Sequence, residues 1–226
     1  RRTMPLPSSQ AADALVNGLQ QVLQATTGRP VRRVETHISW VLLDGEIAWK
    51  VKKPVHLGFL DFSELEVRRH DCEEELRLNR RLAPAIYLDV VPIHGSATAP
   101  RLSGEGEPIE YALRMKQFAA GALFSERLAA GTLDAPSIDR LAARLAAFHS
   151  AAPAAGDDTP YGDPAVILAT TAQVLAGLEA QAGVRAVADL RDWCEAQGRR
   201  LRARFATRKR QGWVREGHGD LHLDNL

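Results

Sequence analysis

The sequence predicts an α+β fold in which a β-rich first half is followed by a helical second half. Strand-like patterns flank the dipeptide Asp44-Gly45, a strong hairpin turn signal, and return between residues 86 and 118. Beyond residue 118 the composition shifts to Ala, Leu and Arg, and apolar residues recur at helical spacing. We therefore expect an N-terminal lobe over residues 1–117 and a helical C-terminal lobe over residues 118–226.

The N-terminal lobe is expected to alternate helices with paired strands. The expected elements are helices over 8–27 and 63–82, and strands over 31–43, 46–53, 86–93 and 108–118. Ser63 and Glu66 have the spacing of a capping box at the start of the second helix. The segment 54–62 between hairpin and helix is rich in apolar residues and is predicted to be a loop.

The C-terminal lobe is predicted to contain helices and loops without strands. Apolar residues at helical spacing predict helices over residues 135–152, 164–182 and 184–211, with a Pro/Gly/Asp loop over 153–163. The end of the last helix is strongly basic but lacks an aromatic stacking pattern or a nucleic-acid-binding motif, so we expect a solvated face and no nucleic-acid partner.

Composition places the chain among ordinary globular proteins. It has 226 residues, 45% of them hydrophobic, with a net charge of +1 that excludes no class of partner. Cys72 and Cys194 stand far apart in predicted helices, so we expect free thiols rather than a disulfide. We see no apolar run of the roughly 20 residues that a membrane span needs. The start also lacks the apolar region of a signal peptide, and we expect a cytoplasmic protein without membrane contact.

The most informative stretch is the phrase His218-Gly219-Asp220 and its continuation to Asn225. An Asp stands five positions before an Asn, and a His stands two positions before that Asp. Protein kinases use this spacing, H-x-D-x-x-x-x-N, in their catalytic loop, where the Asp accepts the proton of the substrate hydroxyl and the Asn binds magnesium. Gly219 permits the tight turn that such a loop needs.

With Gly where protein kinases have Arg, the phrase HGDLHLDN resembles the aminoglycoside phosphotransferase family of small-molecule kinases. More narrowly, the chain is similar to bacterial proteins in which a P-loop ATPase domain follows the kinase-like one. The resemblance covers about residues 31–226 and implies a protein-kinase-like bilobal fold with its site in the cleft. It implies ATP and Mg²⁺ as cofactors, Asp220 as catalytic base, Asn225 as metal ligand, and a small-molecule acceptor with a hydroxyl or amine.

The same resemblance implies a lysine that holds the ATP phosphates. Ile47-Ala48-Trp49-Lys50 matches the V-A-I-K pattern, so Lys50 is the first choice, and Lys52 on the same strand face is the alternative. A helix glutamate must hold that lysine. Counting seven residues back from the closing Leu of the helix, as in the resembled family, gives Glu75; Glu74 is the alternative, about 100° away around the helix.

Two further kinase parts are less plain in this chain. The order of elements assigns the adenine-binding hinge to Met115, Lys116, Gln117 and Phe118. No G-x-G-x-x-G stands between the first two predicted strands, and Thr36–Ser39 occupies the region where kinases carry their glycine-rich loop. We therefore expect hydroxyl and backbone N–H groups, rather than a glycine-rich loop, near the phosphates.

The second metal-binding Asp of kinases, which follows the Asn by one hairpin, is missing. The sequence stops one residue after Asn225, so we expect the natural protein to continue and this chain to be poorly active. The resemblance also implies an attached ATPase domain downstream.

Two other functions are compatible with the sequence. A metal-dependent hydrolase would use the cluster of imidazoles and carboxylates formed by His218, Asp220, His222 and Asp224, residue types that suit zinc or manganese. A non-catalytic nucleotide-binding module that regulates an attached domain would keep the ATP site and lack phosphate transfer.

Overall fold

The computed structural model describes residues 9–57 and 60–225. They form an α+β protein with an antiparallel sheet and, within this part of the chain, six α-helices. The chain divides into two compact units, one running to Thr132 and rejoined by the residues from Leu221, the other spanning Leu133–Asp220. The sequence predicted a division after residue 117, whereas the first unit also takes in α3 (Phe124–Ala129).

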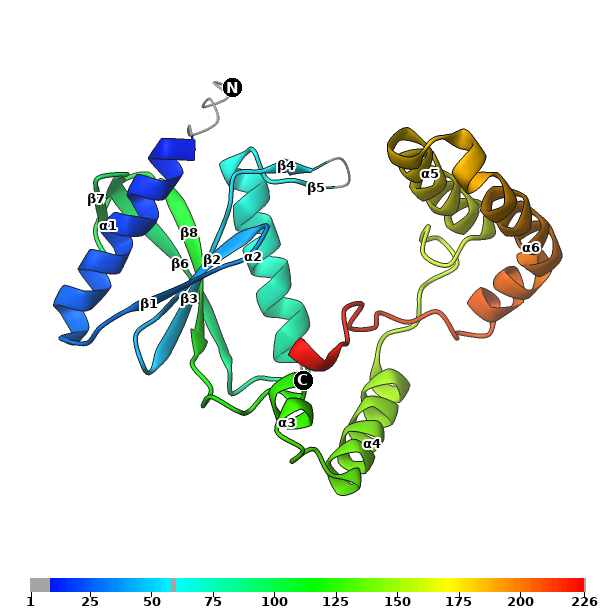
Figure 1. The fold of residues 1–226 in the computed structure, drawn as a ribbon. Coiled ribbons are helices and arrows are strands. Elements are labelled where there is room, and N and C mark those ends of the chain that lie inside the picture. The colour runs from blue at the N-terminus through cyan, green and yellow to red at the C-terminus, as the bar shows by residue number, and fades with distance from the viewer. Residues whose placement is uncertain (1–8, 58–59, 226) are drawn as a thin grey trace. The chain divides into compact units, whose positions relative to one another are not determined.

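The main sheet of the first unit has six antiparallel strands in the order β1-β2-β3-β8-β6-β7 (Figure 1). Their bounds are β1 Arg32–Glu35, β2 Ser39–Leu43, β3 Ile47–Lys52, β6 Tyr87–Ser96, β7 Ala99–Arg101 and β8 Glu110–Lys116. The predicted loop over 54–62 contains a small hairpin of β4 (His56–Leu57) and β5 (Leu60–Asp61). β3 lies inside the sheet, where both of its edges are paired, one with β2 and the other with β8.

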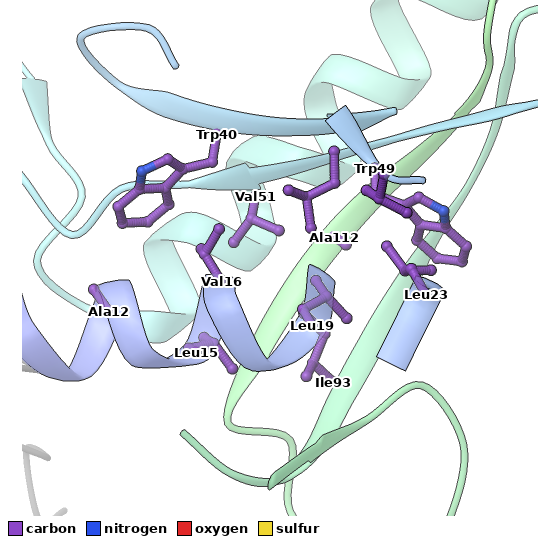
Figure 2. Close-up of a cluster of buried hydrophobic side chains, with 12 residues drawn as sticks. Ala12, Leu15, Val16, Leu19, Leu23, Trp40, Trp49, Val51, Ile93 and Ala112 are labelled. Atoms are coloured by element: carbon purple, nitrogen blue, oxygen red, sulfur yellow. The ribbon is translucent and has the colours of Figure 1, made fainter. Parts of the chain in front are cut away.

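Two helices pack on opposite faces of this sheet. α1 (Ser9–Thr27) lies over one face and α2 (Leu65–Arg80) over the other (Figure 1). The buried cluster under α1 combines its apolar stripe with inward side chains of the strands (Figure 2). Because side chains alternate along a strand, Trp49 and Val51 face α1, while Lys50 and Lys52 face α2.

The predicted hairpin at Asp44-Gly45 is confirmed. The Asp44 carboxylate accepts hydrogen bonds from the backbone N–H of Glu46 (2.9 Å) and Ile47 (2.7 Å), and from the Trp49 indole N–H (3.2 Å). Gly45 has φ of 98°, a conformation that favours glycine. This turn fixes the register in which Val41 of β2 lies opposite Lys50 of β3.

The single strand predicted over residues 31–43 is wrong. Two antiparallel strands, β1 and β2, occupy this range and are joined by a tight turn. The turn forms because Thr36 and Ser39 bond each other: the Thr36 N–H donates to the Ser39 carbonyl (2.9 Å), and the Ser39 N–H donates to the Thr36 hydroxyl (3.0 Å). A hydroxyl that bonds nearby backbone offers the chain this alternative to continuing a strand.

The capping box predicted at Ser63 and Glu66 is also wrong. The helix begins at Leu65 after an extended Glu64, and no side chain caps it. Ser63 lies in the preceding loop, where its N–H donates to Asp61 (2.9 Å) and its carbonyl accepts from Arg68 (3.0 Å). Arg68 therefore fixes the loop before the helix, through the carbonyl of the serine that was expected to cap the helix.

The second unit is helical, as predicted. It contains α4 (Ala135–Ala151), α5 (Pro164–Ala182) and α6 (Val184–Arg210), all within a residue or so of the expected ranges. Asp134 and Asp163 cap α4 and α5 by accepting backbone hydrogen bonds. Both cysteines are free, Cys72 in α2 and Cys194 in α6, in agreement with the expectation of no disulfide.

By length and composition, α5 is the one helix in the described part of the chain that could cross a membrane. It was not expected from the sequence, because polar residues interrupt its apolar residues. One of them, Glu179, forms an ion pair with Arg191 of α6. A single helix of this kind also occurs in soluble proteins and is weak support for membrane association.

Candidate functional site

Two lysines of β3 and two carboxylates of α2 form a chain of contacts in the first unit. The Lys50 ammonium donates to Oε1 of Glu75 at 2.7 Å, and the Lys52 ammonium donates to Oε2 of the same carboxylate at 2.6 Å. Lys52 also lies 2.5 Å from Oδ2 of Asp71. Asp71 and Glu75 are four residues apart, so they share one face of the helix.

The members of this network differ in their access to solvent. The Lys52 side chain is 4% exposed, whereas that of Lys50 is 24% exposed. Glu75 is mostly buried, and Asp71 is partly open. The Lys52 ammonium lies 5.5 Å from the centre of the Phe62 ring, which covers it. Lys50 therefore stands at the open end of the network and Lys52 inside it.

The charges in this network stabilise one another. Burial of Lys52 disfavours its ammonium form, but Glu75 and Asp71 more than offset this and raise its pKa. Burial likewise disfavours the Glu75 carboxylate, yet Lys50 and Lys52 hold its pKa below the ordinary value. Glu75 and Lys52 are consequently both charged at neutral pH.

Two neighbouring side chains stay neutral. Burial, assisted by the negative charge of Glu75, raises the pKa of Tyr87 to about 12. Burial also raises the pKa of the Cys72 thiol to about 12, although the Lys52 charge works in the other direction. Cys72 is therefore protonated at neutral pH and is no nucleophile.

The structure distinguishes between the two glutamates left open by the sequence. Glu75 faces β3, whereas Glu74 points to solvent and pairs with Arg77 at 2.8 Å. The two lysines, by contrast, are not exclusive alternatives, since each bonds a different oxygen of Glu75.

The sequence did not reveal a second ion pair between α2 and the sheet. Arg68 and Glu110 of β8 lie 2.9 Å apart, with side chains only 3% and 4% exposed. Arg68 also donates to the carbonyls of Phe62 (2.7 Å) and Ser63 (3.0 Å). Burial raises the pKa of Glu110 against the opposing effect of Arg68. The sequence signal that could have revealed this pair is the charged Glu110 directly before the apolar run Tyr111-Ala112-Leu113, where burial is expected.

The predicted hinge residues lie at the end of β8. Met115 and Lys116 belong to the strand, and the N–H groups of Lys116 and Gln117 donate to the carbonyls of Ile86 and Glu46, each at 2.7 Å. The Gln117 side chain accepts from the Gly45 N–H at 3.0 Å. Phe118 follows the strand with a half-exposed ring. The N–H groups of Lys116 and Gln117 are thus already engaged, and Gln117 and Phe118 are the predicted hinge residues beyond the strand.

The terminal loop has the turn that its sequence predicted. Gly219 has φ of 85°, and the Asp220 N–H donates to Nδ1 of His218 at 3.3 Å. Asn225 ends a short 3₁₀ turn, η1 (Leu223–Asn225), and its N–H donates to the His222 carbonyl at 2.9 Å. The boundary between the compact units falls directly after Asp220, so Asp220 belongs to the helical unit and Asn225 to the sheet unit.

The metal cage of the hydrolase alternative is not assembled. Across residues 9–57 and 60–225, no three His, Cys, Asp or Glu side chains are grouped as metal ligands. Within the proposed cluster, Nδ1 of His222 lies 3.8 Å from Oδ2 of Asp224. The arrangement offers no geometric support for a zinc or manganese hydrolase.

The chain is similar to long mycobacterial proteins. It is 29% identical over 198 residues to the uncharacterized protein Rv2004c of Mycobacterium tuberculosis and, to the same extent, to the uncharacterized protein Mb2027c of Mycobacterium bovis. These alignments cover 85% of this chain but only 38% of each relative. No family model matches the chain, and no solved structure does.

Proposed function

We propose that this chain is the kinase-like part of an ATP-dependent phosphotransferase that acts on a small molecule. The observation that carries the proposal is the 2.7 Å ion pair between Lys50 of β3 and Glu75 of α2. Kinases use a strand lysine, held by a helix glutamate, to bind the ATP phosphates. An ammonium fixed in this way neutralises phosphate charge without having to be ordered when the ligand binds.

In this proposal each residue has one task. Lys50 binds the phosphates and Glu75 orients it. Phe118, with the end of β8, contacts the adenine. Asp220 accepts the proton of the acceptor hydroxyl or orients an acceptor amine, as the H-x-D-x-x-x-x-N spacing suggests. A protein-kinase-like bilobal fold is part of the proposal.

Asn225 offers a single amide oxygen to Mg²⁺, which prefers octahedral oxygen coordination. The described residues contain no group of three His, Cys, Asp or Glu side chains that could hold a metal ion. We assign no step to the metal. Dependence on Mg²⁺ stays a prediction, as do the cytoplasmic location and the small-molecule acceptor.

The length of the relatives supports one further part of the proposal. The chain spans little more than a third of the proteins that it matches. An attached domain, such as the ATPase domain implied by the resemblance, is therefore compatible with the relatives' length. Its activity and its partners remain proposals.

Nucleotide binding is the first test. We expect ATP to raise the melting temperature of the chain, and we expect Lys50→Met to remove most of that shift. Lys53→Met is the matched control, because Lys53 directly follows β3 but pairs with Glu35, away from the network. Equal responses to ATP in both variants would contradict the proposal.

Transfer is the second test. In the full-length protein, Asp220→Asn should lower phosphate transfer to an acceptor by about 10²–10⁴-fold, the usual contribution of a general base, while ATP affinity stays unchanged. Loss of ATP binding in this variant would show that Asp220 has another role. ATP binding without transfer by the unaltered protein, across a broad acceptor panel, would favour the regulatory module instead.

A further inference from the structure

We propose that Lys52 and Asp71 act as a clamp that positions Glu75, so that Lys50 is the only lysine of the pair that presents its amine to a ligand. The identity of the ligand, the phosphate groups of a nucleotide, rests on the proposed function. The clamp itself rests on contacts within the first unit.

The contacts of Lys52 leave it no donor for a ligand. An ammonium has three N–H donors. One is directed to Oε2 of Glu75 at 2.6 Å and another to Oδ2 of Asp71 at 2.5 Å. The remaining side of the ammonium is covered by the Phe62 ring, 5.5 Å away. With 4% of its side chain exposed, Lys52 is a positioning residue rather than a binding residue.

Lys50 has the opposite character. Among the described residues, its recorded partner is the other oxygen of Glu75, at 2.7 Å. About a quarter of the side chain is open to solvent. One N–H is thus held by Glu75, and the ammonium retains donor capacity for an incoming anion. The clamp therefore leaves Lys50, and not Lys52, with an ammonium that can bind an anion.

The clamp also fixes the carboxylate between the two amines. Asp71 and Glu75 are one helical turn apart, so their joint grip on Lys52 ties this stretch of α2 to β3. Without Lys52, one oxygen of Glu75 loses its partner, and the carboxylate gains freedom to rotate away from Lys50. Two carboxylates would then also face a single remaining cation, Lys50.

The first experiment needs no nucleotide. Brief amine acylation of the folded chain, followed by mass spectrometry, should modify Lys50 several-fold faster than Lys52. The pKa of the Glu75 carboxyl, followed by carbon NMR, should rise in Lys52→Met, which removes one of the two cations beside it, and stay constant in the control Lys53→Met. Equal labelling of both lysines, or an unchanged Glu75 pKa, would overturn the clamp.

The second experiment measures ATP affinity by calorimetry. Lys52→Met should weaken binding about tenfold, the effect of losing one charged hydrogen bond at the positioned carboxylate, with Lys50 intact. Asp71→Asn, at a partly open position, should weaken it less, and Lys52→Arg should restore part of the loss. A shift of the Lys52 amine nitrogen resonance on ATP addition, rather than of Lys50, would make Lys52 the ligand and refute the clamp.

The two proposals fail in different ways. If the unaltered chain binds no ATP, the phosphotransferase proposal fails, while the labelling and NMR results still decide whether Lys52 positions Glu75. If ATP binds and Lys52→Met leaves both its affinity and the Glu75 pKa unchanged, the clamp fails and the phosphotransferase proposal stands.

Discussion

Helix α2 is fastened to the sheet by two sets of charges that differ in their access to water. Near its first turn, Arg68 and Glu110 form a pair with both side chains almost fully buried. Near its last turns, Glu75 meets two lysines, and one of these remains a quarter exposed. The first pair has no room for a ligand, whereas the second leaves an ammonium available.

The comparison separates structural from functional charges on physical grounds. Burying an ion pair costs desolvation that its mutual attraction only partly repays. The raised pKa of Glu110 is the sign of that cost, since burial there outweighs the effect of Arg68. At Glu75 the two lysines outweigh burial and lower the pKa. A second cation therefore distinguishes the candidate site from the structural pair.

The largest effect on stability is expected at the buried pair of Arg68 and Glu110. Arg68→Met leaves Glu110 buried without its partner and should lower the free energy of unfolding by about 3–5 kcal/mol, measured by urea denaturation. Arg69→Ala is the control: this neighbour makes exposed pairs with Glu66 and Glu73 and should change the free energy of unfolding far less than Arg68→Met.

A double variant tests whether the buried Glu110 carboxylate causes this loss of stability. Replacing both Arg68 and Glu110 with apolar residues removes the uncompensated charge and should recover much of the loss. If the double variant is as unstable as Arg68→Met, the damage comes from the lost contacts with the Phe62 and Ser63 carbonyls rather than from the buried carboxylate.

Compared with the Arg68–Glu110 pair, the network of Lys50, Lys52 and Glu75 is expected to contribute less to stability and more to ATP binding. Glu75→Gln should cost about 1–3 kcal/mol of unfolding free energy and weaken ATP binding about tenfold, because the charged hydrogen bonds to Lys50 and Lys52 are lost. Glu74→Gln should leave both quantities almost unchanged, since its partner Arg77 lies in solvent. If Glu74→Gln lowered stability and ATP binding more than Glu75→Gln, the partner of Lys50 would be Glu74.

The smallest effect is the pH dependence. The folded-state pKa of Glu75 is lowered, so its contribution is present above about pH 4.5 and is lost as the pH falls through the folded value. The difference in melting temperature between the unaltered chain and Glu75→Gln should therefore narrow below pH 4.5. The raised pKa of Lys52 places its loss above pH 10.5. A difference that stays constant from pH 7 to pH 3 would contradict the lowered pKa.

Local patterns predicted most of the elements. The apolar stripe of α1, the Asp44-Gly45 turn and the three helices of the second unit all depend on neighbouring residues. The choice of Glu75 came from its spacing to the end of the helix and agrees with its contact to Lys50. Whether these residues bind ATP stays a prediction.

Long-range contacts were not predictable in this way. Arg68 and Glu110 are 42 residues apart, and nothing near either residue identifies the other as its partner. The same arginine bonds the carbonyl of Ser63, which local spacing had assigned to a helix cap. The turn between β1 and β2 was missed because the β-branched residues on both sides look like one continuous strand.

The Asp44 turn has a consequence for the lysines several residues away. Strand side chains alternate, so a slip of β3 by one residue against its neighbours would direct Trp49 and Val51 toward Glu75 and turn both amines under α1. The Asp44 carboxylate, which closes this turn, thus determines whether the lysines or the apolar side chains of β3 face α2. Damage to the tip of the hairpin could abolish ligand binding while every residue of the network remained in the sequence.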